Sequence, residues 1–145
     1  MQKIRPCLWF DGKAEEAARF YGTIFKNSKI ITSGPVVTVF TIEGQEFMGL
    51  NGGPKFPFTE AVSFMVHCDT QAELDEKWEK LTADGGRPVE CGWLKDKYGL
   101  CWQIGPTALQ RLMMEGDKAS NERVMAALMK MTKLDIATLE AAAKG

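Results

Sequence analysis

The chain has 145 residues, 45% of them hydrophobic, which suffices for one compact domain with its own core and argues against a second independent domain. The formal net charge is -1, from 18 basic and 19 acidic residues without a basic block, and this balance argues against nucleic acid as a partner. No apolar run approaches the roughly 20 residues that span a bilayer, and no signal-peptide pattern opens the sequence, so we expect a cytoplasmic protein without membrane contacts.

The first half of the sequence predicts a strand, a helix and three further strands. Apolar residues alternate in the first strand, and the next segment has helical spacing behind Asp11, whose carboxylate is positioned to cap exposed amides. Short β-rich runs follow, separated by glycine-containing turn signals. The expected elements are a strand at 4–10, a helix at 13–25, and strands at 29–32, 36–42 and 45–50.

The second half repeats this order after a proline- and glycine-rich loop. A shift of 58 residues carries Phe10-Asp11 onto Cys68-Asp69, and Asp69 is expected to begin the second helix. Agreement of strands, helix start and aromatic residues in the same order indicates a duplicated βαβββ unit. The expected elements are a strand at 61–68, a helix at 69–83, and strands at 89–94 and 100–104.

A helical tail follows the second module, with helices expected at 107–114, 120–131 and 135–143. Methionines are dense in this tail, and their flexible thioether side chains provide an adaptable apolar surface. Two interpretations stay open for this surface: packing onto the body or a partner subunit, and a groove that binds a peptide. The cysteines of the chain lie singly in apolar stretches, which predicts reduced thiols rather than disulfides.

Six stretches of the sequence resemble the PhnB-like branch of the vicinal oxygen chelate superfamily, which includes glyoxalases, extradiol dioxygenases and bleomycin or fosfomycin resistance proteins. They are Cys-Leu-Trp-Phe-Asp-Gly at 7–12, Glu-Glu-Ala-Ala-Arg-Phe-Tyr at 15–21, Phe-Met-Gly-Leu-Asn-Gly-Gly-Pro at 47–54, Phe-Thr-Glu-Ala-Val-Ser-Phe at 58–64, Cys-Gly-Trp-Leu-Lys-Asp at 91–96 and Lys-Leu-Asp-Ile-Ala at 133–137. The resemblance runs nearly from end to end.

The resemblance implies an α+β fold and a homodimer. Two βαβββ modules, residues 1–53 and 59–106, would form a curved mixed sheet around a pocket, with helices on its convex side and the helical tail at 107–145. All three parts would belong to a single glyoxalase-like domain.

The PhnB-like branch often carries the label of a demethylubiquinone methyltransferase, and the residues argue against that activity. A Rossmann-type methyltransferase needs a glycine-rich turn between a first strand and a helix, with an acidic residue at the end of the second strand. The glycines at 52 and 53 follow a strand, but the proline-rich continuation does not open a helix. We therefore rank methyl transfer last among the functions.

For the metal-using members, the resemblance implies inward-facing His, Gln or Glu ligands on the first and last strands of the modules. The corresponding positions here fall near Arg5, Ser63 and Gln103. Arginine is not a usable ligand, neutral serine is a weak one, and an amide supplies no charge. We expect no complete metal triad and no cofactor. A divalent metal ion stays the alternative, with ligands from Glu46, Glu60, His67 or a partner chain.

The strand faces turned away from the helices are expected to line the pocket. They carry mainly apolar side chains with a few polar groups, the usual make-up of a small-ligand site. Arg5 either holds a ligand carboxylate or phosphate or forms a surface ion pair, and His67 either acts as acid, base or ligand donor or is a polar strand-end residue. The candidates on these faces are Arg5, Cys7, Trp9, Ser63, Met65, His67, Cys101 and Gln103.

Three residues outside these faces complete the candidate pocket. Trp93, like Trp9, either stacks on a planar ligand or fills the core. Glu60 is either a base or ligand contact at the pocket mouth, or a cap or ion-pair partner. Asn51 either reaches the opening with its amide or stabilises a turn.

The sequence thus predicts a protein that binds a small molecule in a concave pocket, and it leaves open whether the protein is catalytic. The first alternative is a divalent-metal-dependent enzyme of glyoxalase or dioxygenase type. The second is a structural or interaction module that uses the methionine-rich tail, and it requires an exposed apolar patch.

Overall fold

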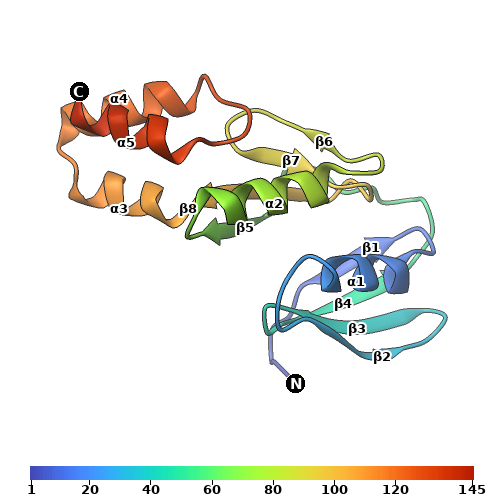
Figure 1. Ribbon diagram of the computed structural model, residues 1–145. Coiled ribbons are helices and arrows are strands. Elements are labelled where there is room, and N and C mark those ends of the chain that lie inside the picture. Colours follow the sequence, from blue (N-terminus) through green and yellow to red (C-terminus); the bar gives the residue numbers. More distant parts are fainter. The chain divides into compact units, whose positions relative to one another are not determined.

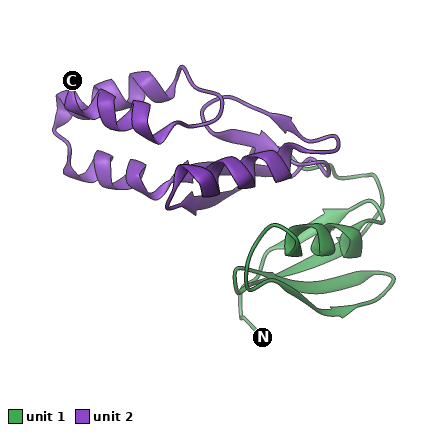
Figure 2. Ribbon diagram, viewed as in Figure 1, with its two compact units in different colours: residues 1–58 green, residues 59–145 purple.

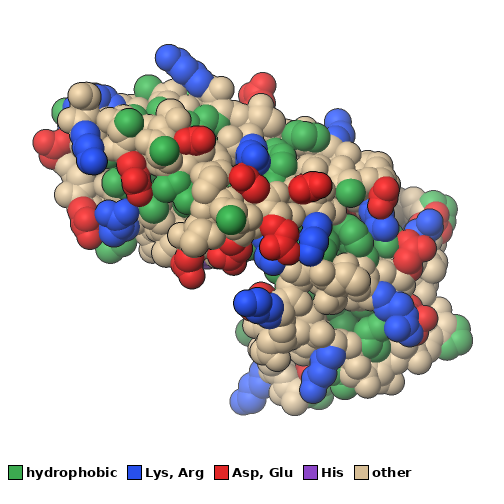
Figure 3. Space-filling view, viewed as in Figure 1, with side chains coloured by type: hydrophobic (Ala, Val, Ile, Leu, Met, Phe, Trp, Pro, Cys, Tyr) green, Lys and Arg blue, Asp and Glu red, His purple; other side chains and the backbone are tan.

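The computed structural model describes all 145 residues, and the chain divides into two compact units, residues 1–58 and 59–145 (Figure 2). None of the helices combines the length and the apolar character that crossing a bilayer requires. On the face of the molecule drawn in Figure 3, Lys and Arg side chains are interspersed with Asp and Glu side chains in both units. This mixture agrees with the small net charge of the chain.

Unit 1 is a βαβββ module with one four-stranded mixed sheet (Figure 1). The strand order is β1-β4-β3-β2, in which β1 runs parallel to β4 and the other pairs are antiparallel. The predicted order of elements is confirmed here. The elements are β1 (Cys7–Phe10), α1 (Ala14–Gly22), β2 (Lys29–Ser33), β3 (Val37–Ile42) and β4 (Gln45–Asn51).

Alternation along the strands decides which face of this sheet α1 covers. Phe40 on β3 and Phe47 on β4 are buried and stack with ring centroids 5.6 Å apart, and Tyr21 of α1 lies over Phe40. Successive side chains of a strand point to opposite faces, so Cys7 and Trp9 of β1 lie on the face that α1 leaves uncovered.

Two details predicted for the first module are wrong. Asp11 does not cap α1 through its side chain; the backbone N–H of Ala14 instead donates to Asn51 Oδ1 at 2.9 Å. The first strand was expected to begin at residue 4, but Ile4 lies outside it and is 90% exposed. The reason is that strand β1 begins only at Cys7, so Ile4 has no regular partner strand.

Unit 2 repeats the βαβββ order and adds the tail. Its strand order is β5-β8-β7-β6, with β5 parallel to β8 and the other pairs antiparallel, which matches the pairing in unit 1 and confirms the duplication. The elements are β5 (Ser63–Cys68), α2 (Gln71–Thr82), β6 (Arg87–Pro88), β7 (Trp93–Lys95), β8 (Cys101–Pro106), α3 (Thr107–Glu115), α4 (Lys118–Leu128) and α5 (Ile136–Lys144).

The strand expected at 89–94 is replaced by the shorter strands β6 and β7. Cys91 and Gly92 lie between them with φ of 61° and 84°, and two consecutive residues in the left-handed region turn the chain. Helix α2 begins at Gln71, two residues later than expected, because Thr70 is its N-cap: Thr70 Oγ1 accepts from the N–H of Glu73. The Glu73 carboxylate accepts from the N–H of Asp69, one residue before the N-cap, in an arrangement similar to a capping box.

The tail helices pack against each other and are tied to the body of unit 2. Val124 of α4 and Leu139 of α5 are fully buried. The segment between these helices is held from two sides. The N–H groups of Cys91 and Gly92 donate to the carbonyls of residues 131 and 132, and the Gln71 side chain of α2 bonds the carbonyl of residue 134 and the N–H of residue 136. The tail is therefore an integral part of this unit.

Candidate functional site

The sheet face of unit 2 that α2 leaves uncovered carries rows of directly opposed side chains. Strand β8 lies between β5 and β7, and Gln103 of β8 faces Met65 on one neighbour and Trp93 on the other. Neighbouring strands lie about 4.8 Å apart, so these three side chains form one continuous row. The flanking rows are Ser63, Cys101 and Lys95 on one side, and His67 with Gly105 on the other.

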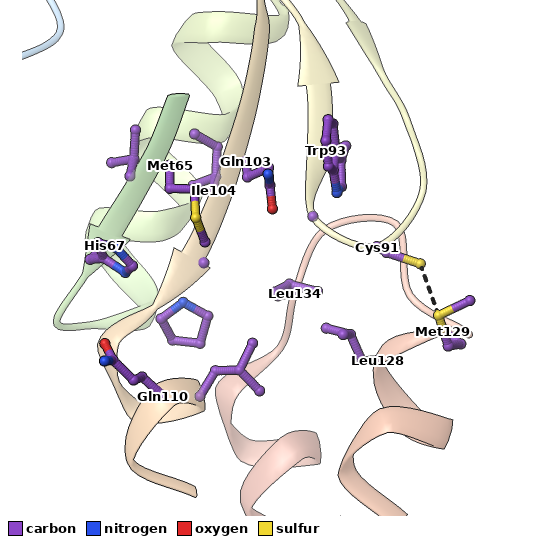
Figure 4. A pocket seen from close by; sticks show the side chains of 15 residues that line it. Met65, His67, Cys91, Trp93, Gln103, Ile104, Gln110, Leu128, Met129 and Leu134 are labelled. Carbon is purple, nitrogen blue, oxygen red and sulfur yellow. Dashed lines mark hydrogen bonds between the residues drawn. The ribbon is translucent and has the colours of Figure 1, made fainter. Parts of the chain in front are cut away.

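The tail lies over this face and borders a groove of about 620 Å³ (Figure 4). This volume falls within the range of about 300–1,000 Å³ that is usual for ligand pockets. The sheet contributes Met65, His67, Trp93, Gln103 and Gly105, and the tail contributes Leu109, Gln110, Leu128, Met129 and Leu134. Four of the predicted pocket residues thus come together in one groove, and its second wall comes from the tail.

Gly105 keeps the floor of this groove open. It lies in β8, directly opposite His67 of β5, and the nearest atom that a Cβ at position 105 would meet is Leu134 Cδ1, at 3.8 Å. A side chain at this position would therefore extend into the groove without a clash at its first carbon. The sequence did not identify Gly105, because a glycine has no side chain that could contribute to the alternation of apolar and polar residues along a strand.

The polar groups of the groove are amides, an indole and an imidazole. Gln103 Nε2 donates to Ser63 Oγ at 2.9 Å, and Figure 4 shows the oxygen end of this amide directed into the groove. The indole N–H of Trp93 has no acceptor in the protein, in contrast to Trp9 and Trp102, whose N–H groups donate to Gly53 O and Asp96 Oδ2. The groove therefore offers hydrogen-bonding groups that the protein itself does not use.

No Lys, Arg, Asp or Glu side chain lines the groove. Lys95, one row further along the same sheet face, is ion-paired with Glu60, and the hydrogen bond from Lys95 lowers the pKa of the Glu60 carboxyl. Cys101 lies in that same row and is buried, which raises the pKa of its thiol. The ion-pair interpretation of Glu60 thus matches the structure, and the lining of the groove itself carries no Lys, Arg, Asp or Glu side chain.

Two sulfur-containing side chains meet at the tail side of the groove. Cys91 Sγ lies 3.8 Å from Met129 Sδ, as the dashed line in Figure 4 marks, and Met129 is 64% exposed. Sequence reasoning placed Met129 only in a general apolar surface and did not single out Cys91. The methionine-rich composition of the tail indicates an apolar surface, but it does not predict which strand the methionines contact.

The candidates from the first module are held by contacts within unit 1. Arg5 Nη1 donates to Glu46 Oε2 at 2.9 Å, which is the surface-ion-pair interpretation of this residue. The ring of Trp9 lies edge-on to Phe56, with centroids 4.9 Å apart. Both polar atoms of the Asn51 side chain are hydrogen-bonded within unit 1: Oδ1 accepts from the first turn of α1, and Nδ2 donates to the carbonyl of residue 35. Cys7 is exposed.

The residues proposed as alternative metal ligands do not fit a divalent ion. Glu46 and Glu60 are each ion-paired with a basic side chain in their own unit. His67 lies four strand positions beyond Ser63, a span of about 13 Å along an extended strand. No group of three or more His, Cys, Asp and Glu side chains is arranged to hold a metal ion.

A methyl-donor cofactor of the Rossmann type does not fit either. The glycines at 52 and 53 follow β4, and the next helix of the chain, α2, begins only at Gln71. In a Rossmann-type site a glycine-rich turn leads directly into a helix whose N-terminus faces the cofactor. Neither sheet has the open parallel arrangement of that fold, since each contains a single parallel pair.

Comparison with known proteins gives one family and several similar structures. A family model described as 3-demethylubiquinone-9 3-methyltransferase matches residues 2–105. The match ends before the tail that borders the groove. A PhnB protein from Bacillus cereus is 36% identical in sequence, and the likeness covers 73% of this chain and 100% of that chain with a TM-score of 0.66. No match is found among curated proteins.

Two more distant structures share the fold. A glyoxalase-related enzyme from Fulvimarina pelagi is 17% identical over 74% of this chain and 90% of that chain, with a TM-score of 0.53. The fosfomycin resistance protein FosX from Listeria monocytogenes, solved in complex with Mn(II) and sulfate, is 19% identical over 79% and 98% of the two chains, with a TM-score of 0.57. At these identities the likeness concerns the fold alone.

Proposed function

This chain belongs to the PhnB-like branch of the vicinal oxygen chelate superfamily, and on that premise we propose that it binds a small molecule in the groove of unit 2 without a metal ion. The groove itself carries the proposal. It has the volume of a ligand site, its walls are mainly apolar, and its few polar groups come from β5, β7, β8 and α3.

Binding fits the groove better than proton-transfer catalysis does. His67 is the one lining residue of the type most used for acid–base chemistry, and no other side chain is hydrogen-bonded to it to orient its ring. Catalytic histidines are generally oriented by such a second group. No cluster of candidate ligands within this chain supports the metal-dependent alternative, and no glycine-rich turn that leads into a helix supports methyl transfer.

A variant that fills the groove tests this proposal. Gly105→Leu places an isobutyl side chain on the floor of the groove, where the first carbon meets only ordinary contacts. Gly34→Leu is the matched control, because it adds the same side chain in unit 1 at a site where the nearest atom, Val37 O, also lies 3.8 Å from the new Cβ. Neither glycine has a positive φ, so the backbone accepts leucine at both positions.

The wild type and both variants are incubated with a chelator-treated extract of cellular metabolites, and the small molecules that each protein retains are identified by mass spectrometry. We expect at least one compound to be retained by the wild type and by Gly34→Leu, and at least tenfold less by Gly105→Leu. Identical retention by all three proteins would refute the proposed binding function. Circular dichroism of the variants shows that a loss of retention is not a loss of fold.

A further inference from the structure

We infer that the groove of unit 2 selects an uncharged, planar molecule that carries hydrogen-bonding groups at its edge. This inference rests on the proposed function, since it names the class of molecule that the same groove takes. Three properties of the lining lead to it: its charge, its unused hydrogen-bonding groups and the shape of its floor.

The charge of the lining excludes ions. A charged group moved from water into an apolar site costs several kcal/mol unless a partner charge or several hydrogen bonds receive it. The groove has no Lys, Arg, Asp or Glu side chain to act as that partner, and Lys95, in the neighbouring row, is already paired with Glu60. An anion or a cation would therefore lose its hydration in the groove and gain no counter-charge.

The unused polar groups favour a ligand with donors and acceptors. The Trp93 indole N–H is a free donor, and the oxygen of the Gln103 amide is a free acceptor because its nitrogen end is bonded to Ser63. Gln110, on the tail side, has an amide without a partner in the protein. A bound molecule that leaves such groups unpaired forfeits about 1 kcal/mol or more for each, so the groove discriminates against purely apolar compounds.

The shape of the groove favours a flat molecule. Its floor is a pleated sheet surface with a gap at Gly105, and the row of Met65, Gln103 and Trp93 runs beside that gap. The opposite wall is formed by aliphatic side chains of the tail, among them Leu134 (Figure 4). The Trp93 ring makes no stacking contact with another aromatic ring of the protein, so its face is available to a planar ligand.

A set of naphthalenes with identical rings tests the charge selectivity. The probes are 2,6-dihydroxynaphthalene, naphthalene-2,6-dicarboxylate and 2,6-bis(aminomethyl)naphthalene, which is a dication at neutral pH. Because the substituents lie at opposite ends of the ring system, no orientation keeps both charges in water. Binding is measured by equilibrium dialysis for the wild type and for Gly105→Leu. We expect the diol to bind the wild type at least tenfold more tightly than either charged probe, and to lose this binding in the variant.

A second variant tests whether the hydrogen-bonding groups of the groove contribute to ligand selection. Gln103→Leu removes the amide and leaves an apolar side chain of comparable size, so it should weaken the diol about threefold to tenfold. The same variant should bind 2,6-dimethylnaphthalene, which has no hydrogen-bonding group, at least as well as the wild type does. A purely structural role of Gln103 would weaken both probes equally and would overturn this part of the inference.

The possible failures are distinguishable. If a charged naphthalene binds as tightly as the diol, and Gly105→Leu abolishes that binding, the groove is a binding site but the inferred class is wrong. If the diol does not bind at all, the inferred class is also wrong. The metabolite-retention experiment then decides separately whether the proposed function falls with it.

Discussion

The substitution Gly92→Ala measures how tightly the tail is held on the sheet of unit 2. Gly92 has a φ of 84°, and a Cβ at this position would lie 3.1 Å from two side-chain atoms of Leu134 and 3.2 Å from Ile104 O. The backbone cannot move away easily, because the Gly92 N–H donates to the carbonyl of residue 132 and its own carbonyl accepts from the N–H of Ile104, both at 2.8 Å. The new methyl group therefore presses directly on the tail.

The expected loss follows from three contributions. A left-handed conformation costs a non-glycine residue about 1–2 kcal/mol. Overpacking against Leu134 and the Ile104 carbonyl costs about 1–3 kcal/mol. Replacing glycine by alanine restricts the unfolded chain, which offsets about 0.4–1 kcal/mol. We therefore expect Gly92→Ala to lower the free energy of unfolding by about 2–4 kcal/mol.

Gly99→Ala is the matched control. Gly99 has a φ of 86°, but no atom lies within 4 Å of the Cβ that alanine would add. The backbone cost and the unfolded-state gain are the same, so the loss should be about 0.5–1 kcal/mol. Urea unfolding followed by tryptophan fluorescence gives both values, and limited proteolysis reports whether the tail is released. Equal losses for the two variants would refute the packing of Leu134 on Gly92 and with it the wall of the groove.

Three further predictions concern the parts of unit 2 that hold the groove and the thiols of the chain. The Asp96 carboxylate accepts from the indole N–H of Trp102 at 2.9 Å and from the backbone N–H groups of Tyr98 and Leu100 in the turn between β7 and β8. Asp96→Ala removes all three bonds, so urea unfolding should show a loss of about 2–5 kcal/mol. Burial raises the pKa of the Cys68 thiol to about 12, so at pH 8 iodoacetamide should label the exposed Cys7 at once and Cys68 only after unfolding; equal rates would contradict the burial. The hydrogen bond from Lys133 lowers the pKa of the Asp75 carboxyl below its ordinary value of 3.8. The contact therefore stabilises the fold fully at pH values above 3.8, and this stabilisation is lost as the pH falls through the lowered pKa. Because both side chains are exposed, Lys133→Ala should lower the free energy of unfolding by less than about 1 kcal/mol at pH 7 and should have no effect at acid pH.

The strand faces of the second module could be predicted because the side-chain period of a strand is two. The alternation that separates Ser63, Met65 and His67 from their neighbours is a property of the sequence, and the structure places all three on the uncovered face of the sheet. The same argument placed Gln103 beside them. Pairing of β8 with both β5 and β7 adds Trp93 to this row, a neighbour that the sequence pattern did not predict.

The second wall of the groove could not be predicted from the sequence. Helical periodicity shows that a helix has an apolar side, but it does not say which surface that side covers. The tail is fixed by contacts between distant residues, such as the bonds from Gln71 to the segment before α5. The turn at Cys91 and Gly92 could not be predicted either, because an apolar run predicts a strand and does not reveal the positive φ values of these two residues.

The role of single charged residues also depended on distant partners. Arg5 is paired with Glu46, 41 positions away, and this pairing uses the guanidinium that the sequence left open for a ligand anion. Asp11 occupies a position typical of a cap, but the amide of Asn51 reaches the first turn of α1 from a neighbouring strand. The homodimer, the cytoplasmic location and the exclusion of nucleic acid stay predictions.

The central claim is that the groove binds its ligand through neutral side chains and without a metal ion. The most direct test is the metal content of protein purified without chelator, measured together with thermal melting in the presence of added zinc, nickel, manganese and ferrous iron. We expect far less than one bound ion per chain and no shift of the melting temperature. An ion near one per chain, with a melting shift that grows with its concentration, would refute metal-free binding and favour a metal-dependent enzyme.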